Sequence, residues 1–404
     1  MYKPYVVSWN LTHECNLACP HCYIDAGEKS GHELSTDEVK SVVDDLYNLN
    51  NHMMLILTGG EPMLRQDIFE IVEYADRKGM ITVLGSNGSL FTDDNLSLLK
   101  KAGLKGMGIS LDSTYPSYHD SFRGRAGLWD KSVESLRLAK DMNFETQVDV
   151  TLKDANWEEI GDFIELGVKL GVRAVNFFFL VCVGRAMHTY ISTDNYEFAL
   201  NRISGLSMSE KRLMVRARCA PHFYRVLHES GASIAQGTKG CMAGRTYMRI
   251  SPDGYVTPCP YMDYPLGDVR KASVADIWAS SDVLSVLRDD QFKGRCGICE
   301  YIEVCGGCRA RAYAETGDIL QEDSLCTYKP DGNRKKITLS DDLNKELIWE
   351  ADARDRMARV PFFMKNILIK VIENKARQKG FSTVTSALID EIKGKEGSVM
   401  HGKR

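Results

Sequence analysis

The strongest constraint on the fold is an alternation of short apolar runs with amphipathic segments over the first half of the chain. Six runs rich in β-branched and aromatic residues are predicted strands, at residues 5–9, 53–57, 81–84, 106–111, 146–152 and 174–180. Between them, apolar residues recur at helical spacing over residues 36–49, 66–78, 92–102, 129–142 and 157–170. This alternation predicts an α/β fold with a parallel sheet, whose active site lies at the carboxyl ends of the strands.

Three cysteines follow the first predicted strand at the spacing Cys15-x3-Cys19-x2-Cys22. Three thiolates this close together can hold three irons of a [4Fe-4S] cluster and leave the fourth iron open to a small molecule. A zinc knuckle is the alternative, because His13 and His21 lie in the same stretch. The spacing favours the iron–sulfur cluster.

The stretch from Trp9 to Tyr23, which reads WNLTHECNLACPHCY, resembles the radical S-adenosylmethionine (SAM) superfamily. The resemblance implies a partial (β/α)6 barrel with the cysteine loop directly after its first strand. It also implies that SAM binds the open iron and that its cleavage gives a 5′-deoxyadenosyl radical. A low-potential electron donor such as ferredoxin or flavodoxin is then an expected partner.

Further motifs follow the next predicted strands in the order of the superfamily's SAM contacts. Gly59-Gly60-Glu61-Pro62 follows the second strand, where glycines let the backbone approach a ligand and free carbonyls can accept from the SAM ammonium group. By the same resemblance, the ribose and carboxylate contacts are Ser86, Asn87, Ser110, Asp112 and Arg123. The alternative for each is a tight turn or a local hydrogen bond.

A second cysteine-rich region reads Cys241-x12-Gly254-x4-Cys259, Cys296-x2-Cys299-x5-Cys305-x2-Cys308 and then Cys326. It resembles the SPASM extension of radical SAM enzymes, which carries auxiliary iron–sulfur clusters. By that resemblance one [4Fe-4S] cluster is held by Cys296, Cys299, Cys305 and Cys326. A second would be held by Cys241, Cys259 and Cys308, with Cys219 or a non-protein ligand as the fourth.

The extension also departs from the family pattern, because two residues separate Cys305 from Cys308 where three are usual. The sequence therefore leaves undecided whether the extension holds one auxiliary cluster or two. A pair of zinc ribbons is the alternative to iron–sulfur clusters. Cys182, on the sixth apolar run, is expected to be a buried apolar residue.

Composition narrows the class of protein. A chain of 404 residues with 44% hydrophobic and 26% charged residues suits a globular protein of two or three domains. The net charge of −4 gives no electrostatic basis for binding nucleic acid. The longest apolar stretch is too short to span a bilayer, and the start lacks a secretory signal pattern. Twelve cysteines then indicate metal or redox chemistry in a reducing compartment, so we expect a cytoplasmic protein.

Shifts in composition predict three domains. We expect a radical SAM core over residues 1–210, a SPASM-like iron–sulfur domain over 211–332 and a small helical domain over 340–396. Breaks at 359–363 and 379–382 divide the helical tail, with Gly380 as a C-cap and Ser382 as the next N-cap. The tail resembles the helical domain that ends one subunit of light-independent protochlorophyllide reductase.

Several segments look like the tetrapyrrole-modifying radical SAM/SPASM enzymes, namely residues 106–113, 177–181, 184–186, 219–223 and 305–313. They are most like the branch that forms haem b by oxidatively decarboxylating two propionates of Fe-coproporphyrin III to vinyl groups. An auxiliary cluster would accept the released electron. Arg185 is the expected propionate-binding cation, with Arg309 and Arg311 as further candidates, and His222 is a candidate axial iron ligand. The alternative for Arg185 is a surface ion pair, and the alternative for His222 is a structural role.

Other functions stay open. A didecarboxysiroheme deacetylase or a haem d1 biosynthesis enzyme would share the fold and the clusters. A radical SAM peptide maturase is a more distant alternative. Such enzymes often carry an N-terminal recognition domain, and only about eight residues precede the stretch from Trp9 that carries the cysteine loop here. A zinc-binding scaffold without activity is the alternative from another class.

Overall fold

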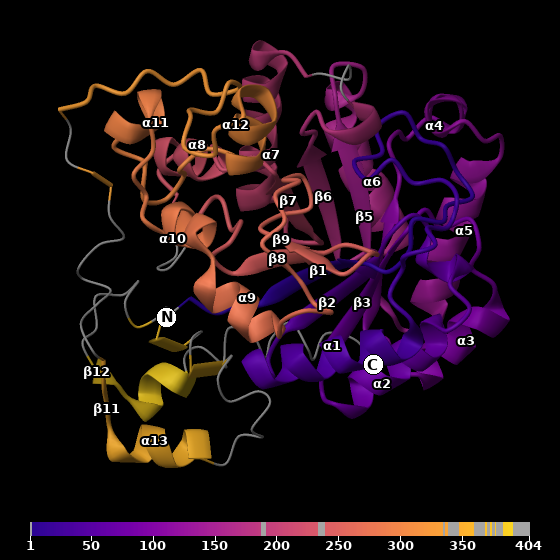
Figure 1. Cartoon of the computed structure of the whole chain (residues 1–404). Helices are drawn as coiled ribbons and strands as arrows, with labels where there is room; N and C mark the ends of the chain where they lie inside the picture. The colour runs from indigo at the N-terminus through magenta and orange to yellow at the C-terminus, as the bar shows by residue number, and fades with distance from the viewer. Residues whose placement is uncertain are drawn as a thin grey trace. The chain divides into compact units, whose positions relative to one another are not determined.

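The computed structural model describes residues 2–186, 191–232, 239–333, 336–337, 347–358, 368–369, 372–373, 376 and 383–390. The chain divides into two compact units, drawn in Figure 1. One unit consists of Met1–Ser233 and Lys239–Ile337, and the other of Ile234–Thr238 and Thr338–Arg404. All the cysteines belong to the first unit.

A ten-stranded sheet forms the frame of the first unit, in the order β10-β9-β8-β1-β2-β3-β4-β5-β6-β7. Its first six strands are β1 (Val6–Asn10), β2 (Met54–Thr58), β3 (Ile81–Ser86), β4 (Gly106–Ser110), β5 (Glu145–Leu152) and β6 (Ala174–Phe179). They pair in parallel and in chain order, as a partial (β/α)6 barrel requires. The prediction of these six strands is confirmed.

The sheet continues beyond the predicted strands at both edges. β7 (Met214–Arg218) pairs in parallel with β6, and β8 (Tyr247–Ile250) pairs in parallel with β1. Two antiparallel strands, β9 (Tyr255–Thr257) and β10 (Gly267–Asp268), follow β8. The sequence does not predict β7, because Arg216 and Arg218 interrupt its apolar pattern.

Helices cover one face of the sheet, as Figure 1 shows. They are α1 (Thr36–Leu49), α2 (Ile68–Arg77), α3 (Asp93–Lys101), α5 (Leu128–Asp141), α6 (Ile160–Leu170) and α7 (Thr193–Ser209). Ser35 and Thr92 cap α1 and α3 through capping boxes, at the predicted helix starts. An additional helix, α4 (Pro116–Arg123), precedes α5; its polar composition hides it from a search for apolar periodicity.

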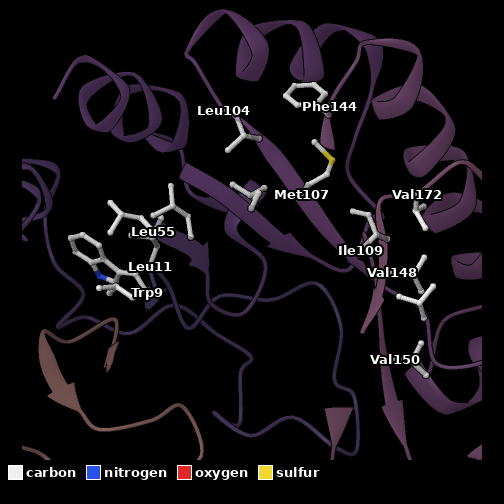
Figure 2. Packing of buried hydrophobic residues seen from close by; sticks show 14 of the residues in the cluster. Trp9, Leu11, Leu55, Leu104, Met107, Ile109, Phe144, Val148, Val150 and Val172 are labelled. Carbon is white, nitrogen blue, oxygen red and sulfur yellow. The ribbon is translucent and has the colours of Figure 1, made fainter. Parts of the chain in front are cut away.

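The main hydrophobic core lies between the sheet and these helices. Alternate strand residues such as Trp9, Leu55, Met107 and Val148 are completely or almost completely buried there, and Figure 2 shows such residues along β1, β2, β4 and β5. Burying an apolar side chain of this size contributes about 1.5–3 kcal/mol. The remaining residues of each strand point to the opposite side of the sheet, which we call the inner face.

Short helices and cysteine-bearing loops make up the rest of the first unit. The helices are α8 (Phe223–Glu229), α9 (Val274–Ser280), α10 (Asp282–Arg288), α11 (Gly294–Ile298) and α12 (Arg309–Thr316). In Figure 1, α8, α11 and α12 gather beside α7. These short helices and loops carry the second cysteine-rich region of the sequence, from Cys241 to Cys326.

The second unit is small and has an apolar cluster of its own, which includes Leu347, Ala353, Ile372 and Leu388. It contains α13 (Ala351–Ala358) and a parallel pair of two-residue strands, β11 (Ile348–Trp349) and β12 (Thr383–Val384). The strand pair corrects the expectation of a purely helical tail, since strands this short carry no periodic signal. The predicted breaks at 359–363 and 379–382, including Gly380 and Ser382, lie outside the described residues.

Every helix in the described part of the chain falls short of the length and apolar character that crossing a membrane requires.

Candidate active site

The loop after β1 carries Cys15, Cys19 and Cys22 and closes on itself through its backbone. The Cys15 amide donates to the Gly27 carbonyl at 2.8 Å, and the Cys22 amide donates to the Cys19 carbonyl at 3.2 Å. The Ala26 amide lies 3.3 Å from the Cys22 sulfur, as in backbone hydrogen bonds to a thiolate. Burial raises the pKa of Cys15 to about 11. Such thiols ionise when a metal binds them, so the loop fits a cluster held by three thiolates.

The Gly59–Pro62 turn packs directly on this loop. The Gly60 amide donates to the Thr12 carbonyl and the Glu61 amide to the Glu14 carbonyl, both at 2.8 Å. A Cβ on Gly60 would lie 2.2 Å from the Glu14 carbonyl oxygen, and one on Gly59 would lie 2.5 Å from the Thr12 carbonyl oxygen. Contact between two loops is thus the first reason for these glycines. The predicted hydrogen bonds from this turn to SAM stay a prediction.

The buried carboxylate of Glu61 ties the same turn to the end of β3. It accepts from the Ser86 hydroxyl at 2.9 and 3.0 Å and from the Asn87 amide at 2.9 Å. The Asn87 side chain donates to Asn16 of the cysteine loop at 2.9 Å. Burial raises the pKa of Glu61 against these hydrogen bonds. Ser86 and Asn87, which the resemblance predicts as SAM contacts, therefore also connect three loops to one another.

A buried ion pair stands at the carboxyl end of β4. The Arg123 Nε lies 2.7 Å from one Asp112 carboxylate oxygen, and the Thr151 amide donates to the other at 2.8 Å. Burial is the strongest single influence and would raise the pKa of Asp112, but the charges of Arg123, Lys153 and the neighbouring histidines together outweigh it and lower that pKa. Arg123 also acts electrostatically on Cys15 and Cys19. A cation so close to the cysteine loop is suited to the carboxylate of SAM, and Ser110, the last residue of β4, lies on the same edge.

Four cysteines of the extension line one cavity together with His222; they are Cys296, Cys299, Cys305 and Cys326. Two hydrogen bonds to sulfur occur there. The Gly307 amide donates to the Cys305 sulfur at 3.4 Å, and Arg309 lies 3.7 Å from the Cys296 sulfur. Four thiols around one cavity fit a [4Fe-4S] cluster.

The other four cysteines of the region, Cys219, Cys241, Cys259 and Cys308, form a second group. Burial raises the pKa of Cys219 and of Cys259, and the neighbouring thiols of the group raise both further. Cys219, Cys259 and Cys308 also pack in one buried cluster. Cys219 thus lies beside Cys241, Cys259 and Cys308, the three cysteines for which the sequence analysis left the fourth ligand open. As a separate finding, no three His, Cys, Asp or Glu side chains of the described residues form a site for a single metal ion.

Arg185 has partners other than the expected one. Its Nε donates to the Cys19 carbonyl at 2.9 Å, and its Nη1 donates to the Asp25 carboxylate at 2.6 Å and to the Ala26 carbonyl at 2.8 Å. These contacts favour a role in positioning the cysteine loop over the predicted binding of a propionate.

His222 is 2% exposed, and its Nδ1 lies 2.6 Å from the Tyr196 hydroxyl. Burial lowers its pKa to about 4. Because His222 lines the cavity of the auxiliary cysteines, its position favours a structural role there over the predicted role of axial iron ligand. Arg309 and Arg311 are equally buried and are bonded within the extension.

The sequence analysis did not identify Asp323, which contacts both cysteine groups. Its backbone carbonyl accepts from the Cys326 amide of the first group at 3.1 Å. Its carboxylate accepts from the Cys308 amide at 2.6 Å and from Arg311 at 2.8 and 2.9 Å. Arg311 in turn donates to the Cys219 carbonyl at 3.1 Å. No local pattern marks Asp323, because its partners lie 12 and 15 residues away in the sequence.

Three family models match the chain. The radical SAM superfamily matches residues 9–167, the SPASM iron-sulfur cluster-binding domain matches residues 241–309, and the proto-chlorophyllide reductase 57 kD subunit matches residues 349–393. Together with the cysteine loop at the edge of a parallel sheet, these matches define a radical SAM enzyme with a SPASM extension. Its cofactors are SAM and [4Fe-4S] clusters, auxiliary clusters included.

Several characterised enzymes are similar in sequence to this chain over about four-fifths of its length. The AdoMet-dependent heme synthase of Methanosarcina barkeri is 36% identical over 81% of this chain and 97% of its own length. The Fe-coproporphyrin III synthase of the same organism is 30% identical, over 80% of this chain and 88% of its own length. The PqqA peptide cyclase of Rhodopseudomonas palustris is also 30% identical, over 81% and 88% of the two chains. The chain belongs to the radical SAM/SPASM family of haem-synthesis enzymes.

Solved structures show the same fold at low sequence identity. SuiB of Streptococcus suis bound to SAM has a TM-score of 0.67 and 14% identity, over 81% of this chain and 78% of SuiB. The enzyme anSMEcpe with bound AdoMet has a TM-score of 0.63 and 19% identity, over 80% and 94% of the two chains.

Proposed function

We propose that this enzyme oxidatively decarboxylates propionate side chains of Fe-coproporphyrin III to vinyl groups, which gives haem b. The observation that carries the proposal is the similarity to an AdoMet-dependent heme synthase along nearly that protein's whole length. A tetrapyrrole is therefore the proposed substrate. The electron donor is proposed to be a ferredoxin or a flavodoxin.

The residues of the cysteine loop have the first role in this proposal. Cys15, Cys19 and Cys22 hold the cluster that supplies, when bound, the electron for cleaving SAM to the 5′-deoxyadenosyl radical. Arg123 binds the SAM carboxylate while Asp112 orients its guanidinium. The Gly59–Pro62 turn, Ser86, Asn87 and Ser110 contact the rest of SAM. Arg185 holds the loop in position.

The two cysteine groups of the extension have the second role. Loss of a hydrogen atom from the propionate β-carbon leaves a substrate radical, which becomes a vinyl group when CO2 and one electron depart. That electron needs an acceptor close to the substrate. The groups built on Cys305 and on Cys308 are suited to hold two [4Fe-4S] clusters that can take it.

The test is an anaerobic incubation of the reconstituted enzyme with SAM, dithionite and Fe-coproporphyrin III, followed by mass spectrometry of the porphyrin. The proposal expects 5′-deoxyadenosine and a porphyrin that has lost the mass of formic acid at two positions. Deoxyadenosine with unchanged porphyrin would overturn the proposed reaction and leave the radical chemistry intact.

A second candidate is supported by the 30% identical Fe-coproporphyrin III synthase. In that case the enzyme would deacetylate didecarboxysiroheme, and the same incubation with that substrate would change its mass. Haem d1 formation is the remaining tetrapyrrole alternative. The 30% identical PqqA peptide cyclase supports a peptide substrate, but the heme synthase match has the higher identity, 36%, and covers a larger share of the relative, 97% against 88%.

A further inference from the structure

Two arginines on β7 point away from the hydrophobic core. Val215 and Ala217 pack into the core between the sheet and the helices. Side chains alternate along a strand, so Arg216 and Arg218 emerge on the inner face. Both are half-buried there.

Neither guanidinium is neutralised by an ion pair within the described residues. Arg218 Nε donates to the Asn176 side chain at 3.3 Å, and Arg216 Nη2 lies 2.9 Å from the Met214 sulfur. The charged neighbours are Asp149, which is bonded to Asn176 at 2.7 Å, and Arg173. Burial raises the pKa of Asp149 to about 6, and this carboxyl group supplies at most one negative charge against two cations, so it neutralises them only in part. Partly desolvated cations of this kind favour an anionic ligand.

These arginines lie where a substrate could reach both the cysteine loop and the second cysteine group. β7 runs parallel to β6 in the same sheet as β1, so Arg218, its last residue, lies on the edge that carries the cysteine loop. Cys219 of the second cysteine group follows directly. A ligand held by Arg218 would therefore lie beside that group. Arg185, Arg309 and Arg311, by contrast, each make two or more hydrogen bonds to carboxylate or carbonyl oxygens of the protein.

We propose that Arg216 and Arg218 form the anion-binding site for the substrate's carboxylates, which are propionate groups if the substrate is a tetrapyrrole. The planar guanidinium group suits a carboxylate because it can donate two parallel hydrogen bonds. The identity of the carboxylates as propionates rests on the proposed function. The inference of an anion-binding site depends only on the two arginines on the inner face of β7.

The test compares the binding of Fe-coproporphyrin III with the binding of its tetramethyl ester, by absorbance titration of the reconstituted enzyme without reductant. Arg216→Gln and Arg218→Gln are each expected to weaken binding of the acid about 10- to 100-fold and to leave binding of the ester unchanged. Arg216→Lys and Arg218→Lys should recover part of the affinity. Arg202→Gln is the matched control, because Arg202 is exposed on α7 and, among the described residues, donates only to the Glu158 carbonyl.

Wild-type affinity for the acid in both glutamine variants would overturn the inference, and so would equal losses for acid and ester, since these indicate a structural role. If Arg218→Gln lowers the iron content through its neighbour Cys219, Arg216→Gln alone decides. The proposed function fails separately, when the wild-type enzyme binds the porphyrin but leaves its mass unchanged after reduction with SAM.

Discussion

Single residues that were expected to touch SAM or the substrate also hold the surrounding loops together. Ser86 and Asn87 bond to Glu61 and to Asn16, and Arg185 bonds to the backbone of the cysteine loop. A family resemblance assigns a residue to a site, but it gives no information about contacts between loops. Because these contacts decide where the thiols lie, we expect substitutions here to affect iron content before they affect the fold.

Gly60→Ala tests the contact between the Gly59–Pro62 turn and the cysteine loop. The added Cβ would lie 2.2 Å from the Glu14 carbonyl oxygen, so the turn must move away from the loop. We expect at least a tenfold loss of 5′-deoxyadenosine formation and a destabilisation of about 1–3 kcal/mol in urea unfolding. Gly31→Ala is the control, because a Cβ at Gly31 meets nothing within 4 Å. Equal activity of the two variants would contradict this prediction.

Arg123→Met tests the buried ion pair with Asp112. Removing Arg123 leaves the Asp112 carboxylate buried without its counter-charge, which costs about 3–5 kcal/mol in the free energy of unfolding. The double variant Asp112→Asn, Arg123→Met should recover part of that loss. Arg137→Met serves as the comparison, since the exposed Arg137–Glu134 pair at 3.8 Å contributes about 0–1 kcal/mol. Similar unfolding midpoints for Arg123→Met and Arg137→Met would show that the buried pair is not stabilising.

At the scale of helices and strands, sequence reasoning succeeded where periodicity was strong. The first six strands and the helices between them follow from apolar runs and helix caps. β7 was missed because its arginines face the inner side, and α4 was missed because it is short and polar. The cysteine spacing identified the cluster loop, whereas the position of Cys219 depends on β7 and could not follow from spacing. The expected domain boundaries and ligand sets stay predictions.

Cys219→Ala tests the second cysteine group. Cys219 follows β7 directly in the sequence and lies in this group. With three [4Fe-4S] clusters the reconstituted enzyme should bind about 12 irons per chain, and the variant about eight. Iron and sulfide analysis with electron paramagnetic resonance of the reduced clusters gives the comparison. Cys182→Ala should keep the wild-type iron content, because Cys182 belongs to neither group. Full iron content in Cys219→Ala would point to a non-protein fourth ligand.

At the scale of the whole molecule, the chain combines a catalytic unit with a smaller unit that has its own apolar cluster. The match of the smaller unit to the proto-chlorophyllide reductase 57 kD subunit covers residues 349–393, outside the radical SAM and SPASM matches. A unit with a hydrophobic core of its own can in principle fold without its neighbour.

We therefore expect a chain that ends at Ile337 to keep the catalytic unit. Its iron content and its formation of 5′-deoxyadenosine should stay within about twofold of the full-length values, because all the cysteines lie before that residue. Iron analysis and chromatography of the reaction products measure both quantities. Loss of iron from the shortened chain would show that the second unit stabilises the first.

The most direct test of the central claim follows a hydrogen atom from the substrate to SAM. Fe-coproporphyrin III deuterated at the propionate β-carbons is incubated with the reduced enzyme and SAM, and the 5′-deoxyadenosine is analysed by mass spectrometry. The account predicts deuterium in the 5′-deoxyadenosine together with vinyl groups on the porphyrin. Unlabelled 5′-deoxyadenosine beside a decarboxylated porphyrin, or labelled substrate recovered intact, would contradict it.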